Sequence, residues 1–400
     1  MLAAQRPPLD APTRAVDIVV NNYNYGRFLR AALDSALAQR HPAVTVTVVD
    51  DGSTDHSREV IAAYGDRVNA VFKDNGGQAS ALNAGWGHCR GDVVIFLDAD
   101  DVLLPATAAH FAAAFETRPD VAKVQAKVLL IDAEGATIGH HPRPDELLPS
   151  GDLRRDELTF PFDIPWLPTS ANAFSTAVLR RIMPIPEQEF ARSADWYLKH
   201  LTPLLGSVVS LDETCACYRI HGSNNYQPVE PTLDLEHVRQ TISYAATTDR
   251  YLRRLAREVG LPAPDGRIMS VADLANRLIS RKLQPQAHPL PGDRVGRLAL
   301  AGIIAATKRF DVRWPMKLLF IGWFAATAVA PRRMTEMLAV GFLFPRRRGP
   351  INRLLRPLVK ATDESRELKA AHSAAPRAAE RRLSSRCRED RLRQRRGQGD

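Results

Sequence analysis

The stretch Val94–Pro105, VIFLDADDVLLP, sets an apolar run directly against three carboxylates in four positions. Asp98, Asp100 and Asp101 follow what reads as a buried β-strand, and the chain then turns apolar again. At an effective dielectric constant of about 20, two unit charges about 5 Å apart repel by roughly 3 kcal/mol. Such a cluster is typical of a site where a divalent cation, with an anionic ligand of its own, relieves the repulsion.

The same stretch belongs to the last of four strand–helix units that run from residue 16 to about residue 131. Each unit joins a short β-branched run to an amphipathic helical pattern. The four runs are VDIVVNN (16–22), VTVTVVD (44–50), VNAVF (68–72) and VVIFLD (93–98). Units of this kind in series predict an α/β fold with a mostly parallel sheet flanked by helices, in which ligands bind at the carboxyl ends of the strands.

The net charge of the chain, +9 over 400 residues, is concentrated in its last segment. Residues 346–400 carry 17 Lys/Arg against 7 Asp/Glu, whereas residues 1–345 carry 37 against 38. We expect a disordered N-terminus at 1–14, an α/β domain at 15–230, a helical region at 231–345 and a basic, disordered tail at 346–400. The tail has no aromatic residue among its arginines, which argues against a nucleic-acid partner.

The spacing of the cysteines and the hydropathy of the chain indicate where in the cell the protein is expected. None of the four cysteines forms a CxxC pair, and the N-terminus lacks the apolar core of a signal peptide, so we expect a cytoplasmic protein. Three apolar blocks, at 298–307, 318–330 and 337–345, alternate with Lys/Arg clusters and are shorter than the roughly 18 residues of a spanning helix. These blocks either pack on the domain or, as we favour, attach the protein peripherally to the inner face of the cell membrane, together with the basic tail.

Five sequence blocks carry a family resemblance. They are VVDDGSTD (48–55), DNGGQASALNAG (74–85), FLDADD (96–101), ADW (194–196) and CYRIHGSN (217–224). In this order and spacing they resemble the family 2 glycosyltransferases, which have the Rossmann-like GT-A fold. The resemblance covers roughly residues 16–226. It implies an inverting transfer of sugar from a nucleoside-diphosphate donor, with a UDP-sugar favoured, to a hydroxyl of a glycan or lipid-linked acceptor in envelope or exopolysaccharide biosynthesis.

We call Asp98, Asp100 and Asp101 the acidic stretch, and the resemblance implies specific roles for two of these carboxylates. A divalent cation, manganese or magnesium, would bridge the donor phosphates and stabilise the charge of the leaving diphosphate. The family pattern implies that Asp98 contacts the ribose or supports the metal site, that Asp100 binds the metal, and that His221 closes over the metal or the diphosphate. Alternatively, Asp100 or Asp101 could cap the helix entered through Pro105, and His221 could be a packing residue.

Residues after the first three strands would bind the donor nucleotide. A carboxylate at Asp51 can accept the imide N–H of a uracil-type base, and the resemblance places Tyr23 against that base, unless its ring only fills the sheet edge. Asn21 is a weaker candidate, because the chain reads NNYN where the family more often has PxYN. Three further residues are expected to shape the nucleotide pocket: Asn75, Gly77 and Asn83.

The acceptor hydroxyl needs a general base, and the resemblance assigns it to Asp195. Asp195 lies at the start of a predicted helix with Ser193 as its cap, and the helix N-terminus favours the ionised carboxylate. Ala194 stands where the family usually has Glu, which favours the alternative of a catalytically weak sugar-binding or scaffold protein on the same fold. A nucleotidylyltransferase or a nicotinamide dehydrogenase would need a glycine-rich loop after the first strand, and NNYNYG is not one.

Overall fold

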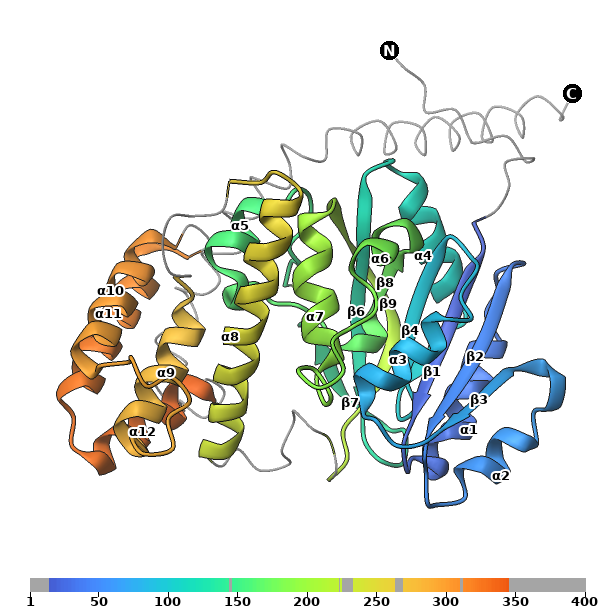
Figure 1. The fold of residues 1–400 in the computed structure, drawn as a ribbon, viewed down its shortest axis with the longest axis horizontal. Helices are drawn as coiled ribbons and strands as arrows, with labels where there is room; N and C mark the ends of the chain where they lie inside the picture. Colours follow the sequence, from blue (N-terminus) through green and yellow to red (C-terminus); the bar gives the residue numbers. More distant parts are fainter. Residues whose placement is uncertain are drawn as a thin grey trace, which may run out of the picture.

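The structure is a computed structural model that describes residues 14–143, 146–222, 224, 233–262, 269–309 and 312–344. The two segments predicted to be disordered, 1–14 and 346–400, lie outside the described residues except for Arg14. One sheet of nine strands runs through the α/β domain (Figure 1). The strands are β1 (Val16–Asn22), β2 (Val44–Asp51), β3 (Asn69–Lys73), β4 (Val93–Asp98), β5 (Val102–Leu103), β6 (Val121–Ile131), β7 (Thr137–His141), β8 (Asn172–Ser175) and β9 (Ser207–Arg219).

The strand order is β3-β2-β1-β4-β8-β6-β9-β5, with β7 paired to β6. The first four strands pair in parallel, as predicted, and β6 pairs in parallel with β9. Strand β8 lies between β4 and β6 and is antiparallel to both. The sheet is therefore mixed and mostly parallel in its N-terminal half, which confirms the predicted fold class.

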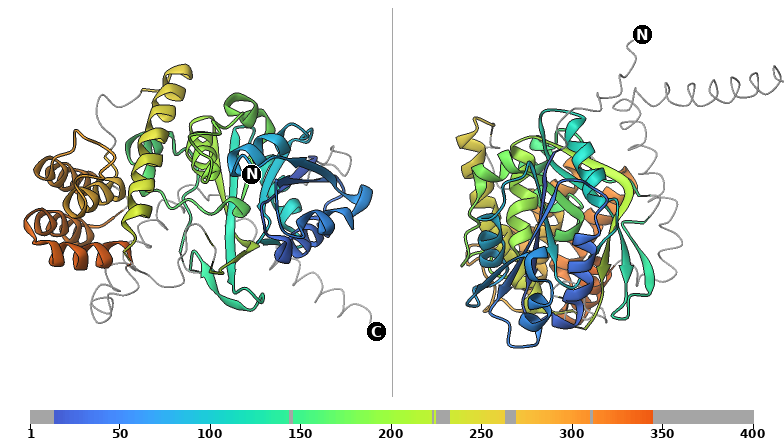
Figure 2. Two further views of the ribbon diagram at one scale, coloured as in Figure 1. Left: turned by 60° about the horizontal axis from the view of Figure 1, so that its bottom comes forward. Right: turned by 90° about the vertical axis from the view of Figure 1, so that its right-hand side faces the viewer.

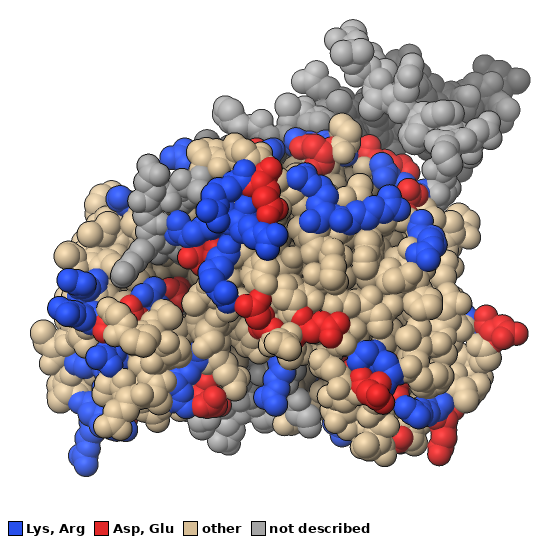
Figure 3. Space-filling view, viewed as in Figure 1, with Lys and Arg blue, Asp and Glu red and all other residues tan. Residues whose placement is uncertain are grey.

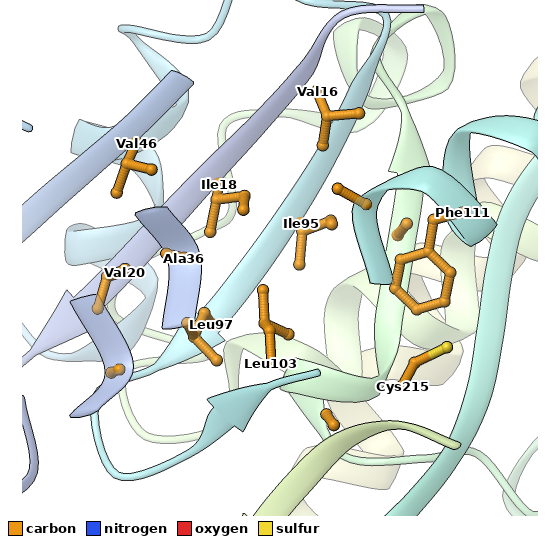
Figure 4. Packing of buried hydrophobic residues seen from close by; sticks show 14 of the residues in the cluster. Val16, Ile18, Val20, Ala36, Val46, Ile95, Leu97, Leu103, Phe111 and Cys215 are labelled. Carbon is orange, nitrogen blue, oxygen red and sulfur yellow. The ribbon is translucent and has the colours of Figure 1, made fainter. Parts of the chain in front are cut away.

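Helices cover both faces of the sheet, as Figure 2 shows from two sides. They are α1 (Gly26–Leu37), α2 (Ser57–Ala62), α3 (Gln78–Trp86), α4 (Thr107–Glu116), α5 (Arg154–Thr159), α6 (Thr176–Ile182), α7 (Ala194–Leu201) and α8 (Leu235–Glu258). Successive strand residues point to opposite faces, so each buried strand supplies two cores. Ile18 and Val20 pack in the core that contains residues of α1, α2 and α4 (Figure 4), while Val19 packs in the core that contains residues of α3, α7 and α8.

Four further helices form a module at one end of the molecule, beyond α8 (Figure 1). They are α9 (Val271–Leu283), α10 (Val295–Lys308), α11 (Trp314–Val329) and α12 (Arg332–Leu343). Residues of α9, α10 and α11 share an apolar core around Phe324. Asp163 of the α/β domain accepts hydrogen bonds from the backbone of Val271 and Ala272 at the start of α9 and lies 3.5 Å from the Arg309 guanidinium. The apolar blocks thus pack on one another and on α9, and the start of α9 and Arg309 contact the domain at Asp163.

No helix in the part of the chain that the structure describes is long and apolar enough to cross a membrane.

Candidate active site

A cleft of about 1020 Å³ lies at the carboxyl ends of β1, β2 and β4 and extends to the first turn of α7. In α/β folds with parallel strands, ligands bind at the carboxyl ends of the strands. Eight of the predicted site residues line this cleft: Asn21, Tyr23, Asp51, Asn75, Gly77, Asp98, Asp100 and Asp195. The sheet therefore brings together side chains from positions 21 to 195 of the sequence.

Asp98 ends β4 and points into this cleft. Its carboxylate accepts hydrogen bonds from Asn21 Nδ2 at 2.8 Å and from Gln78 Nε2 at 3.1 Å. Desolvation within the cleft, followed by the negative charge of Asp100, raises the pKa of Asp98 to about 7. The acidic stretch thus carries the unrelieved repulsion that its sequence suggested.

Asp100 meets His221, which comes from the end of β9. His221 Nε2 lies 3.0 Å from Asp100 Oδ2, and the imidazole ring is buried against the rings of Tyr25 and Phe28, with centroids 5.4 and 5.0 Å away. Arg219 fixes this approach, because its Nε donates to the Asp100 carbonyl at 2.8 Å. The carboxylate of Asp100 is the kind of oxygen ligand that manganese and magnesium prefer, and the imidazole nitrogen beside it suits manganese better than magnesium.

Neither Asp100 nor Asp101 caps helix α4, so the alternative that they act as helix caps is wrong. Asp101 accepts hydrogen bonds from Ser170 Oγ at 2.6 Å and from the Arg219 backbone N–H at 2.9 Å. The N-cap of α4 is Ala106, which makes no side-chain capping bond. The reason is that β5, which pairs antiparallel with β9, separates the acidic stretch from α4. Buried Asp101 instead ties the acidic stretch to the strand that delivers His221.

Asp51 is buried, and its carboxylate organises the loop after β3. Lys73 Nζ donates to Oδ1 at 2.6 Å, and the backbone N–H groups of Gly76 and Gly77 donate at 3.0 and 2.7 Å. Asn75 Nδ2 adds a bond to the Asp51 carbonyl at 2.9 Å. The sequence did not reveal this role in shaping the loop, and contact of Asp51 with a base stays a prediction.

Gly77 allows this loop to approach the segment before α7. Its φ is +85°, and a Cβ atom built there would lie 2.5 Å from the Ala191 carbonyl oxygen. The Gln78 backbone N–H donates to that same oxygen at 2.7 Å. Glycine is therefore required by both backbone conformation and space.

Gly77→Ala is expected to lower the free energy of unfolding by about 2–4 kcal/mol, because it adds a backbone clash to an unfavourable φ. Gly65→Ala is the matched control, since Gly65 also has a positive φ, +52°, but nothing lies within 4 Å of a Cβ built there. Urea unfolding of both variants separates the two costs. Equal losses in the two variants would show that the contact with Ala191 is unimportant.

Two other donor-side predictions have different outcomes. Tyr23 is 46% exposed, so its ring does not fill the sheet edge, and stacking on a base stays a prediction. Asn83 does not shape the cleft, and that prediction is wrong. Its Nδ2 donates to the Ile185 carbonyl at 2.8 Å and its Oδ1 accepts from the Ile185 N–H at 2.8 Å, so the amide is used to hold a distant loop.

Asp195 lies in the first turn of α7 and lines the cleft. Lys199 Nζ, one turn later, is 2.9 Å from Asp195 Oδ2. Ser193 occupies the N-cap position, but its hydroxyl makes no capping bond, contrary to expectation. The side chain of Ala194 is fully buried in the apolar core behind α7. Position 194 thus faces the protein interior, and Asp195 is the acid that this turn presents to the cleft.

Gln78 links the two halves of the site and was not predicted from the sequence. Its Nε2 donates to Asp98, while its Oε1 accepts from the backbone N–H of Ala194 at 3.1 Å. One amide thus connects the end of β4 to the first residue of α7. Gln78 directly follows Gly76 and Gly77 at the start of a helix, and this position was the sequence signal that could have predicted a role in the site.

A buried polar network supports the cleft wall near Asp195. Trp166 lines the cleft, and its indole N–H donates to Glu157 Oε2 at 3.2 Å. Glu157 also pairs with His200 Nδ1 at 2.6 Å, and Lys123 Nζ lies 3.9 Å from the Trp166 ring centroid. Burial raises the pKa of Glu157 well above its usual value and lowers that of Lys123. These contacts fix the position of Trp166.

Residues 17–180 match the family model described as glycosyl transferase family 2. These residues form a glycosyltransferase family 2 domain. An uncharacterized glycosyltransferase of Nostoc sp. is 37% identical over 220 residues, which are 53% of this chain and 66% of that protein. An uncharacterized glycosyltransferase of Rickettsia felis is 31% identical over 158 residues, which are 38% of this chain and 26% of that protein. The matches thus span slightly under two thirds and about a quarter of these relatives.

A solved structure is also similar to this chain. The structure of S. aureus TarS 1-349 in complex with UDP-GlcNAc is 16% identical, with a TM-score of 0.48, and the match covers 82% of this chain and 91% of that chain.

Proposed function

We propose that this family 2 protein is an inverting glycosyltransferase that moves one sugar from a nucleoside-diphosphate donor, preferably a UDP-sugar, to a hydroxyl acceptor. The observation that carries the proposal is the presence, in one cleft, of Asp100, which pairs with the buried His221 behind it, and of Asp195 with Lys199. The first pair suits the binding of a diphosphate through a cation, and the second suits the removal of a proton from an acceptor.

The donor would lie across the carboxyl ends of β1, β2 and β4. Asp100 and His221 would hold manganese or magnesium, which when bound stabilises the negative charge of the leaving diphosphate. Among the described residues no group of three or more His, Cys, Asp or Glu side chains is arranged to hold a metal ion by itself. The donor phosphates would therefore have to complete the coordination. Tyr23, exposed in the cleft, offers a ring face for the base.

The acceptor would enter on the side of α7. Asp195 takes the proton of the attacking hydroxyl group. At the same time the hydroxyl oxygen of the acceptor bonds to the anomeric carbon of the donor sugar, and the bond between that carbon and the diphosphate breaks. Lys199 Nζ, 2.9 Å from Asp195 Oδ2, restricts the orientation of the carboxylate. Trp166 and Trp196 also line the cleft, and aromatic side chains of this kind suit the apolar face of a sugar ring. This supports a glycan, free or lipid-linked, as the acceptor.

The alternative, a catalytically weak binding or scaffold protein, rested on Ala194 in place of Glu. The buried position of Ala194 weakens that alternative, because a side chain facing the core cannot contact an acceptor in the cleft. Both functions predict nucleotide binding, but only the enzyme predicts turnover. We place the enzyme in envelope or exopolysaccharide biosynthesis at the cytoplasmic face of the membrane.

The test is release of nucleoside diphosphate from a panel of UDP-, GDP- and TDP-sugars, with manganese and with a mixture of oligosaccharide acceptors. The proposal expects release from one donor, increased by one acceptor class, with the product linkage inverted relative to the donor by NMR. Binding of a nucleotide-sugar without turnover under any of these conditions would favour the scaffold alternative.

A further inference from the structure

The helical module at the end of the molecule leaves an unusual amount of apolar surface exposed. Among the described residues, seven of the ten exposed large apolar side chains belong to α10, α11 and α12. We call five of them, on α11 and the start of α12, the apolar face: Trp314, Leu318, Val329, Met334 and Met337. Concentration on two consecutive helices is not the scattered exposure that ordinary surfaces show.

Helix α11 is the main carrier of this face. Its exposed positions recur every three or four residues from Trp314 through Leu318 and Gly322 to Val329, which places them along one side of the helix. Leu318 is 61% and Val329 85% exposed. The helix contains one charged residue, Lys317, and only Phe324 and Thr327 are fully buried in it. The core of the module therefore uses one side of α11 and leaves the apolar side that carries Trp314, Leu318 and Val329 exposed among the described residues.

The charge around this face has one sign. Residues 294–345 contain eight Lys/Arg and two Asp/Glu, and the following tail adds a net +10. Figure 3 shows Lys and Arg side chains spread over this end of the molecule. A second copy of the chain, or the chain's own tail, would bring like charges against this face. An anionic partner would bring opposite charges, and a partner that also accepts apolar side chains is a lipid surface.

We propose that the apolar face inserts into the headgroup region of an anionic membrane, with the neighbouring Lys and Arg side chains on the lipid phosphates. Trp314 suits such a boundary, because its indole ring is 63% exposed and lies 5.3 Å from Lys317 Nζ. The attachment is monotopic and lies parallel to the bilayer surface. This inference rests on the α10–α12 surface and not on the donor cleft, so it can fail while the proposed function stands.

The experiment is flotation of the chain of residues 1–400 with vesicles of phosphatidylcholine alone or of phosphatidylcholine mixed with anionic phosphatidylglycerol. The variant is Leu318→Glu/Val329→Glu, which changes two exposed positions. Ile138→Glu is the matched control, because Ile138 is 54% exposed on β7, away from the module. Circular dichroism melting checks that all variants fold.

The proposal expects the wild-type chain and Ile138→Glu to float with the anionic vesicles and not with neutral ones. The double variant should bind about tenfold less or weaker still, the scale of removing an inserted aliphatic side chain. Equal binding of the double variant would show that the basic tail suffices, and would overturn the proposal. So would absence of vesicle binding, or a wild-type dimer in light scattering that the double variant converts to monomers.

Discussion

Replacing Asp195 with Asn should reduce kcat for sugar transfer by about 10³-fold, within the range typical of losing a general base. The amide keeps the shape of the side chain but cannot take the proton of the acceptor hydroxyl. Donor affinity should change little, because Asp195 lies on the α7 side of the cleft and is not part of the Asp100–His221 pair. Steady-state kinetics and donor titration of the same preparation measure the two effects.

Two controls accompany this variant. Asp74→Asn makes the same chemical change in the exposed loop after β3, at a residue that does not line the cleft, and should retain wild-type kcat. Lys199→Gln should lower kcat less than Asp195→Asn does, because it removes only the partner of the base. Transfer at the wild-type rate by Asp195→Asn would mean that another group accepts the proton.

The second large effect is expected at the acidic stretch. Asp100→Asn should weaken manganese-dependent binding of the nucleoside diphosphate about 100-fold, close to 3 kcal/mol. An amide is a poorer ligand for a hard cation than a carboxylate, and it leaves His221 without its anionic neighbour. Thermal shift with the diphosphate, in the presence and absence of manganese, measures the loss.

Asp74→Asn again serves as the control and should keep the full metal-dependent shift. Because Asp100 is only partly buried and its carbonyl, not its carboxylate, holds Arg219, the variant should melt near the wild-type temperature without ligand. A large metal-dependent shift that survives in Asp100→Asn would contradict the assignment of this residue as a metal ligand.

The first half of the fold could be predicted because its signals are local. Strands β1 to β4 and helices α1 to α4 each carry their own periodicity, and the connection type follows from their alternation. Strand β8 was not predicted, because four residues with polar ends give no periodic signal. Strand β9 pairs along its whole length with β6, whose sequence lies some 80 residues earlier. The pairing of strands that are distant in the sequence cannot be predicted from local sequence periodicity.

The site divides in the same way. Motif order placed Asp98, Asp100 and Asp195 in one cleft, and the pairing of β5 with β9 explains how His221 reaches the acidic stretch. Asn83 was misassigned, because its amide binds a backbone 102 residues away. The i,i+4 spacing of Lys199 from Asp195 was a readable signal for their ion pair. The network behind Trp166 was not readable, since its members meet only through tertiary packing.

In the proposed mechanism, the acidic stretch after β4, together with His221, binds a cation that in turn binds the diphosphate of the donor. Isothermal titration of the wild-type chain with uridine and guanosine diphosphates, each with and without manganese, tests it most directly. One diphosphate is expected to bind in the presence of manganese and to bind about 100-fold more weakly without it. Equal affinity with and without the metal, or no binding of any diphosphate, would contradict it.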